Sequence, residues 1–236
     1  MSTLYQAKSL QICRWQSFAS LTSLENIATQ TILDSAQHAI RQRGAFHLVL
    51  AGGNTPQQIY KKLRESFADW HRWHIYFGDE RCLPKNHPER NSLMATEAWL
   101  SHVAIPRQHI HIIPAELGAK IAAQHYAKVV SSVKIFDLVL LGLGEDGHTA
   151  SLFPQHELGQ NLDSPNTLSV FKAPKPPAER VSLSANRLSA AHQVLFLITG
   201  KNKAQALQDW REGIDIPAAA IRPENGVDIF VENHLS

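Results

Sequence analysis

IFDLVLLGLGEDGHTASLFP, residues 135–154, is the stretch that decides the fold of this chain. Its first seven residues form a strongly apolar run, and three closely spaced glycines then lead to Asp146 and His148. An apolar strand that ends in a glycine turn with polar side chains is typical of the carboxyl edge of a buried parallel strand, where open α/β sheets bind ligands. Glycine lets the backbone turn tightly and approach a ligand because it has no Cβ. Since histidine gains and loses a proton near neutral pH, the stretch predicts a catalytic loop.

On both sides of this stretch, short apolar runs alternate with amphipathic segments. Thr22 and Glu25 have the spacing of a capping box ahead of an apolar helical face that includes Ile27, and Gly44 stands where a helix C-terminus favours glycine. The alternation predicts an α/β fold, a mostly parallel sheet with helices on both faces. We expect one domain over residues 1–236, with a long, partly ordered loop over 154–177. The predicted strands are 10–15, 46–51, 74–77, 109–113, 135–141, 194–199 and 227–231, and the predicted helices are 22–40, 56–67, 92–100, 119–130 and 203–210.

Composition excludes several classes of function. The chain has 236 residues, and its 23 basic and 21 acidic side chains leave a formal charge of +2, so no strong field favours nucleic acid or a membrane surface. No apolar stretch approaches the ~20 residues of a membrane helix, and the first residues lack the pattern of a secretory signal. Two cysteines fit a reducing compartment. We therefore expect a cytoplasmic protein with no nucleic-acid or membrane partner.

The turn Gly52-Gly53-Asn54-Thr55-Pro56 lies between a predicted strand and a predicted helix. Proline in the first helical turn loses no hydrogen bond, and the free N–H groups there can face an anion. The threonine adds a hydroxyl donor. An ordinary glycine-rich turn would look similar, but its place before Thr-Pro at a helix start favours phosphate.

A second polar group, Asp79-Glu80-Arg81, also follows a predicted strand. The guanidinium of Arg81 suits a phosphate because it binds in a bidentate way and is always charged. Asp79 is expected to accept sugar hydroxyls or to orient His148. Glu80 points the opposite way on an extended chain, so we expect it to be structural. Taken alone, such a triplet is usually a solvated charge cluster.

Residues 142–154 closely resemble the GxGxDGHxASLFP signature of the 6-phosphogluconolactonases. The related glucosamine-6-phosphate deaminases share the Asp-Gly-His portion but not the Ser-Leu-Phe-Pro ending. Glu145 stands where the lactonases often carry proline. The glycine turn resembles the family's SGGSTP loop, with Asn54 in place of a serine, and residues 79–81 match its DER motif.

Further motifs extend the resemblance over residues 46–203. Thr199 to Lys203 match a GxxK turn, which implies that Lys203 is a second cation for phosphate, while Lys201 is solvated. Arg180 fits a PPxRxTL pattern and is expected either to close over the ligand or to serve as an edge-strand solubility residue. Of the family's Ser-Asn pair only Asn91 aligns, and the last eight residues depart from the usual ending.

The resemblance implies a Rossmann-like, three-layer fold of the glucosamine-6-phosphate deaminase/ribose-5-phosphate isomerase/CoA transferase type. It also implies hydrolysis of 6-phosphogluconolactone to 6-phosphogluconate in the oxidative pentose phosphate pathway. The phosphate would bind the N–H groups of residues 53–55, Arg81 and Lys203. His148 would act as the general base, oriented by Asp146 or by Asp79.

Backbone N–H groups of residues 142–147, among them Gly144 and Gly147, are the expected donors to the oxyanion. A lactone is an activated ester, so we expect no cofactor, no metal and no covalent intermediate. The small-molecule lactone is the expected partner, and the protein is expected to be a monomer or a small homo-oligomer.

Other chemistries have weaker support. The chain has 13 histidines, but His109 and His111 lack accompanying carboxylates or cysteines at ligand spacing. Ser151 lacks the Gly-x-Ser-x-Gly elbow of serine hydrolases. The alternatives are a glucosamine-6-phosphate deaminase or sugar-phosphate isomerase, and a non-enzymatic sugar-phosphate sensor.

Overall fold

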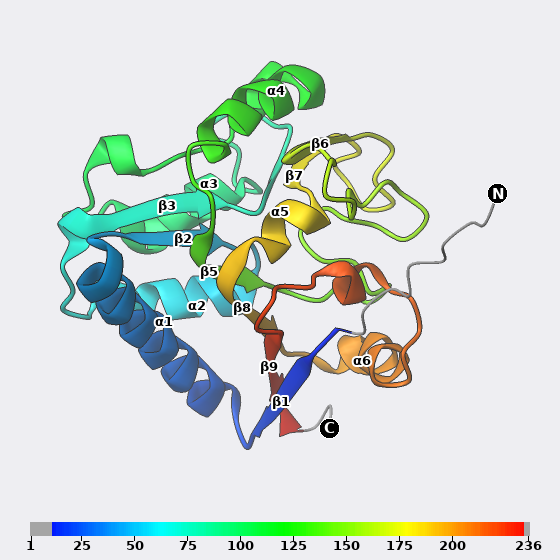
Figure 1. Ribbon diagram of the computed structural model, residues 1–236, viewed down its shortest axis with the longest axis horizontal. Helices are drawn as coiled ribbons and strands as arrows, with labels where there is room; N and C mark the ends of the chain where they lie inside the picture. Colours follow the sequence, from blue (N-terminus) through cyan, green and yellow to red (C-terminus); the bar gives the residue numbers. More distant parts are fainter. Residues whose placement is uncertain (1–10, 234–236) are drawn as a thin grey trace.

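The computed structural model describes residues 11–233, whose centre is a six-stranded parallel sheet (Figure 1). All neighbouring strands in it run parallel, as the alternation of elements predicted. Helices lie on both faces, which gives three layers. In spatial order the strands are β1 (Cys13–Phe18), β9 (Val227–Glu232), β8 (Ala191–Ile198), β5 (Phe136–Leu141), β2 (Phe46–Leu50) and β3 (Trp73–Phe77).

The helical elements alternate with these strands along the chain. The α-helices are α1 (Leu21–Arg43), α2 (Asn54–Arg64), α3 (Asn91–Ala95), α4 (Ala119–Val130), α5 (Ala185–Ser189) and α6 (Ala204–Arg211). A π-helical segment, η2 (Thr96–Leu100), continues α3. Short 3₁₀ turns are η1 (Trp70–Arg72), η3 (Arg107–His109), η4 (Ala115–Leu117), η5 (Lys201–Lys203) and η6 (Pro217–Ala220).

Strand β5 is a central strand of the sheet, as its apolar sequence indicated. All six of its residues are buried, with β8 on one side and β2 on the other. One of them is charged: Asp137 accepts the backbone N–H of His47 at 2.7 Å and pairs with Arg43 at 2.7 Å. These partners allow a carboxylate to lie in an otherwise apolar strand.

The sheet reverses its winding direction between β2 and β5. From β2 the chain continues to β3 on one side, and from β5 it continues to β8 on the other. In open α/β sheets such a switch point leaves a crevice beyond the carboxyl ends of the two strands. The fold therefore places the loops after β2 and β5 at the natural ligand position.

The first helix begins earlier than its predicted capping box. Ser20 is the N-cap, its side chain accepts the N–H of Ser23 at 3.2 Å, and the Ser23 hydroxyl accepts in return from the Ser20 N–H. The Thr22–Glu25 box is therefore wrong, because Thr22 is already helical. Ile27, expected on the buried face, is 45% exposed. Gly44 is confirmed as the helix end, with φ 80° and a hydrogen bond to Ile40 O.

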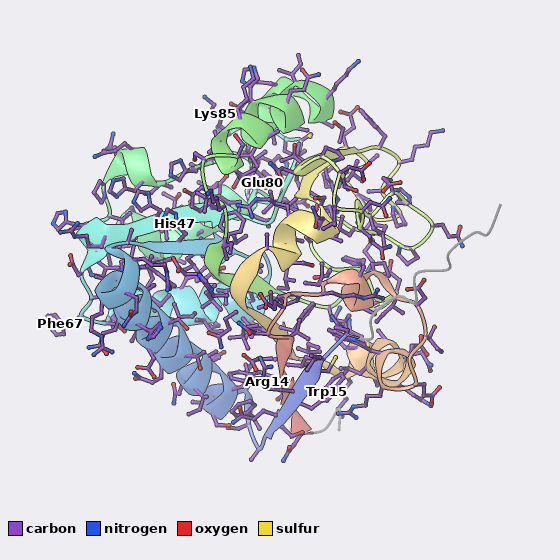
Figure 2. The ribbon with its side chains drawn as sticks, in the orientation of Figure 1. Arg14, Trp15, His47, Phe67, Glu80 and Lys85 are labelled. Carbon is purple, nitrogen blue, oxygen red and sulfur yellow. The ribbon has the colours of Figure 1, made fainter. Side chains whose placement is uncertain are left out.

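Other predicted elements also differ from the structure. The first strand begins at Cys13 rather than at residue 10, which lies outside the described residues. Helix α2 ends at Arg64, and Phe67, its predicted end, projects into solvent (Figure 2). Residues 109–113 form no strand, only an isolated bridge from Ile110 to Ile75.

A second, antiparallel sheet was not predicted. It contains β4 (Asp79–Arg81), β7 (Arg180–Leu183) and β6 (Thr167–Val170) in that order. Strand β6 lies within the stretch expected to be a loop. It is held against α4, where the Thr167 hydroxyl donates to Ala123 O at 2.7 Å. This sheet carries Asp79, Arg81 and Arg180 to the crevice. Among the described residues, no helix is long and apolar enough to cross a membrane.

Candidate active site

A cavity of about 310 Å³ lies beyond the carboxyl ends of β2, β3 and β5. It is lined by glycines and by a strongly cationic set of side chains. The titratable residues lining it are Asp79, Arg81, His148, Lys175, Arg180 and Lys203. Four cations against one carboxylate make the cavity suited to an anion.

His148 forms a pair with the carboxylate of Asp146. Its ring Nδ1 contacts Asp146 Oδ1 within hydrogen-bonding distance. Burial would raise the pKa of Asp146, but the hydrogen bond and charge of His148 lower it. The carboxylate is thus ionised and accepts, so Nδ1 carries the proton and Nε2 has the lone pair. Burial lowers the pKa of His148, although Asp146 raises it. A neutral imidazole with a free Nε2 is suited to accept a proton.

Glycine at position 144 is required by contact with this ring. A Cβ added to Gly144 would lie 1.9 Å from His148 Nδ1. Gly147 is required for a different reason: its φ is 79°, and a Cβ would lie 2.7 Å from Ile216 Cβ. Both glycines therefore shape the loop that holds the imidazole.

The same loop corrects the predicted oxyanion donors. The Gly144 N–H donates to His148 O at 2.7 Å, and the Gly147 N–H donates to Gly144 O at 3.1 Å. Both N–H groups already have a backbone acceptor. A tight turn satisfies its own polar groups, so neither is available to a bound oxyanion.

Asp79 lies in the cavity but does not pair with His148. Its Oδ2 accepts from the Ser151 hydroxyl at 2.5 Å, and its Oδ1 accepts from Asn91 Nδ2 at 3.0 Å. Of the two carboxylates predicted to orient His148, the structure places Asp146 against the ring. Ser151, whose hydroxyl donates to Asp79, is a buried residue with 1% exposure.

Glu80 has the structural position expected for it. It is fully buried (Figure 2), where it accepts the N–H groups of Asn91 and Ser92 and pairs with Arg90 Nε at 3.1 Å. Arg90, only 1% exposed, also pairs with Glu116 at 3.1 Å. This buried ion network fixes the start of α3, and therefore Asn91, beside Asp79.

The glycine turn after β2 borders the cavity through Gly52 and Gly53. Gly53 is the N-cap of α2 with φ 108°, and a Cβ on Gly52 would lie 2.0 Å from Asn91 Oδ1. The first N–H groups of a helix have no intrahelical acceptor, so those at the start of α2 can receive an anion. Asn54 lines a neighbouring groove of about 340 Å³, together with Gly53 and Arg81.

Thr55 is tied to the strand end of β8. Its hydroxyl and that of Thr199 lie 2.6 Å apart. One hydroxyl donates to the other, so the pair retains one O–H for a further acceptor. Neither threonine is among the residues that line the cavity itself.

The predicted cations reach the cavity from three elements. Arg81, in β4, also donates to Glu89 O, and Lys203 ends η5 as the N-cap of α6. Arg180 is 6% exposed, so the solubility alternative is wrong. Its guanidinium donates to Pro176 O at 2.9 Å and to Lys175 O at 3.2 Å. Arg180 therefore fixes the backbone that carries Lys175.

Sequence reasoning missed Lys175 and undervalued Asn91. Lys175 lies in the 154–177 region, which has no periodicity, and the only signal was its place just before the PPxRxTL match. Asn91 contacts both Asp79 and Gly52. Its alignment with the family's Ser-Asn pair was a signal that it belongs to the site.

The histidines with metal-like spacing form an aromatic column instead. His74 stacks on His109 with ring centroids 3.9 Å apart, and on His47 at 4.8 Å. Over residues 11–233, no group of three or more His, Cys, Asp or Glu side chains is arranged to hold a metal ion.

Comparisons with known proteins identify relatives of this chain. A family model described as glucosamine-6-phosphate isomerases/6-phosphogluconolactonase matches residues 19–230. The chain is similar to a 6-phosphogluconolactonase of Nostoc sp., with 33% identity covering 86% of this chain and 88% of the relative. It is also similar to one of Haemophilus influenzae, with 34% identity covering 77% and 82%.

Solved structures show the same fold. A 6-phosphogluconolactonase of Thermotoga maritima has a TM-score of 0.84 and 28% identity, covering 94% of this chain and 99% of the other. One from Trypanosoma brucei has a TM-score of 0.85 and 25% identity, covering 95% and 98%. A monomeric glucosamine-6-phosphate deaminase has a TM-score of 0.80 at 19% identity, over 94% and 98%, which shows the fold alone.

Proposed function

This chain belongs to the family of glucosamine-6-phosphate isomerases and 6-phosphogluconolactonases, and we propose that His148 is the general base of its lactone hydrolysis. Relatives named 6-phosphogluconolactonase match most of the chain at about one-third identity. The reaction is hydrolysis of 6-phosphogluconolactone to 6-phosphogluconate, in the pentose phosphate pathway. We also propose that the chain forms a single catalytic domain.

One observation carries the proposal: His148, whose ring is held by Asp146, lines a single cavity together with four cations. A base alone would serve many hydrolases, and a cationic pocket alone would serve any phosphate-binding protein. Their combination within about 310 Å³ fits a small substrate with an anionic end and an electrophilic carbon.

The phosphate is anchored at the start of α2. The N–H groups after Gly53 face it, and Arg81 and Lys203 neutralise it. Burial lowers the pKa of Lys203, although Glu145 raises it. Binding at this remote group orients the lactone carbonyl toward His148, so binding energy is used to position the reacting atoms.

The chemistry takes two proton transfers at one nitrogen. Water attacks the lactone carbonyl carbon as His148 Nε2 removes its proton, while Asp146 stabilises the imidazolium that forms. The negative charge on the carbonyl oxygen develops in a cavity whose charged lining is mostly cationic. The tetrahedral intermediate collapses, the bond from carbon to ring oxygen breaks, and Nε2 returns the proton to that oxygen. No cofactor enters these steps.

The test compares the purified protein with two variants on freshly made 6-phosphogluconolactone, after subtraction of the enzyme-free rate. We expect His148→Ala to fold normally and to lose about 100- to 10,000-fold in kcat, the usual contribution of a positioned base. His125→Ala is the matched control, because His125 is an exposed residue of α4. Unphosphorylated gluconolactone should be a far poorer substrate.

Other results would disprove the mechanism or identify a different function. Near-wild-type activity of a folded His148→Ala protein would disprove the mechanism. If the lactone is not hydrolysed above background, release of ammonia from glucosamine 6-phosphate identifies a deaminase. Binding of sugar phosphates without turnover identifies a sensor.

A further inference from the structure

Glu145 directly precedes Asp146 in the chain and lies beside Lys175, one of the cations that line the cavity. Its side chain is 51% exposed, and its Oε1 accepts a hydrogen bond from Asn202 Nδ2. Its Oε2 lies 3.9 Å from Lys175 Nζ. The bond from Asn202, followed by the charges of Lys175 and Lys203, lowers the pKa of Glu145. The carboxylate is therefore ionised at neutral pH.

Three segments distant in sequence meet at this carboxylate. Glu145 belongs to the loop after β5, Lys175 to the segment before β7, and Asn202 to η5 after β8. Lys175 and Lys203 are two of the four cations that line the cavity. Glu145 thus places a negative charge beside half of the positive charge available to an anionic ligand.

Position 145 is also one where this chain departs from its family's pattern, since the resembling motif often has proline there. Proline has no charge and no hydrogen-bonding side chain. Whatever Glu145 does electrostatically is a property of this chain's own sequence rather than of the shared motif.

We propose that Glu145 is a specificity-determining residue that weakens the binding of the phosphorylated product more than that of the substrate. This inference rests on the proposed function. The carboxylate screens Lys175 and Lys203 from an incoming phosphate, so it weakens both complexes. Hydrolysis then creates a second anionic group, the product carboxylate, at the carbon beside His148. That carboxylate adds a second negative charge to the ligand, so the charge of Glu145 opposes the product more strongly than it opposes the lactone, whose ring is neutral.

The test is Glu145→Gln, which keeps the size and the hydrogen-bond acceptor but removes the charge. We expect the Kd for inorganic phosphate to fall roughly three- to tenfold at low ionic strength, the scale of one screened charge at close range. The inhibition constant for 6-phosphogluconate should fall by a larger factor than KM for the lactone. Raising the salt concentration should reduce both differences.

Glu224→Gln is the matched control, because Glu224 is an exposed carboxylate in the turn before β9, at the amino edge of the sheet. It should leave all three constants unchanged. Glu145→Asp, which retains the charge, should lie closer to wild type than Glu145→Gln does.

Two outcomes would overturn the inference. Unchanged phosphate and product binding would show that the carboxylate is screened out by solvent. Weaker binding of both would show that Glu145 only organises the two lysines. Phosphate binding by calorimetry requires no turnover, so it decides the role of the Glu145 charge even if the lactonase assay fails.

Discussion

Burial and the neighbouring charges together set the protonation of His148. Burial lowers the pKa of the imidazole, and the neighbouring Asp146 carboxylate raises it, with burial the larger. A general base must be neutral to accept a proton. The acid limb of kcat/KM should therefore fall below the ordinary histidine pKa of about 6.5.

Replacing Asp146 by asparagine tests this balance. Without the carboxylate, the pKa of His148 should fall further, so the acid limb of the kcat/KM profile should move to lower pH. At the same time kcat should drop about tenfold or more, because the Nδ1–H tautomer is no longer held. The measurement is the pH dependence of lactone hydrolysis with Glu224→Gln as control. An acid limb that stays in place, or moves to higher pH, would contradict the assignment.

At the scale of single residues, the sequence predicted which residues belong to the site more reliably than it predicted which groups they contact. It gave His148 two candidate carboxylates, Asp146 and Asp79, and could not choose between them. The choice depends on Ser151 and Asn91, which engage both oxygens of Asp79. The same limit applies to Gly144 and Gly147, whose N–H groups have acceptors that only the folded loop reveals.

At the scale of elements, the strands β2 and β3 carry a histidine column that the site does not use. His47 and His74 stack between neighbouring strands, and His109 and His111 continue the column from the segment that follows. Burial, and then the neighbouring histidines, lower the pKa of His74 to about 4. Burial is also the largest cause of the lowered pKa values of His47 and His111.

This column predicts acid sensitivity of the fold. The folded pKa values lie below the unfolded one, so the unfolded chain takes up protons first as pH falls. The stabilisation is complete above about pH 6.5 and should be lost as pH falls toward about 4. Because His74 is partly exposed, we expect its share to be about 1 kcal/mol after solvent screening.

Urea unfolding of wild type and His74→Phe at pH 7 and pH 5 measures this share. The variant should lose less unfolding free energy between the two pH values than wild type does. Equal losses would exclude His74 as a source of the acid sensitivity.

The elements themselves were predicted unevenly. The parallel strands and α4 were confirmed because each has a clear apolar period. The small antiparallel sheet was missed because its three strands are short and separated in sequence. Strand β6, inside a region rich in turn-forming residues, exists because α4 and β7 supply its partners.

At the scale of the whole molecule, loops after β2, β3, β5 and β8 must meet for the cavity to exist. A ligand that binds there binds only the folded chain, so it should stabilise the entire fold. At 100 times its Kd, 6-phosphogluconate should add about 2.7 kcal/mol. For a protein of this size, that is a rise in Tm of roughly 5–10 °C.

The matched ligand is gluconate, which lacks the phosphate, at the same concentration and ionic strength. It should shift Tm far less, because the anchoring cations then have no dianion to bind. Equal shifts by both compounds would show that the phosphate is not the group the cavity recognises.

The sequence by itself determined the parallel sheet, its central strand and the identity of most charged groups in the crevice. It could do so because apolar periodicity and strand-end glycines are local properties of the chain. Only the tertiary structure decided which carboxylate holds His148, that Arg180 fixes the segment of Lys175, and that Glu145 lies beside Lys175. Those contacts join residues far apart in the chain, and their partners are selected by packing of the two sheets rather than by any local pattern.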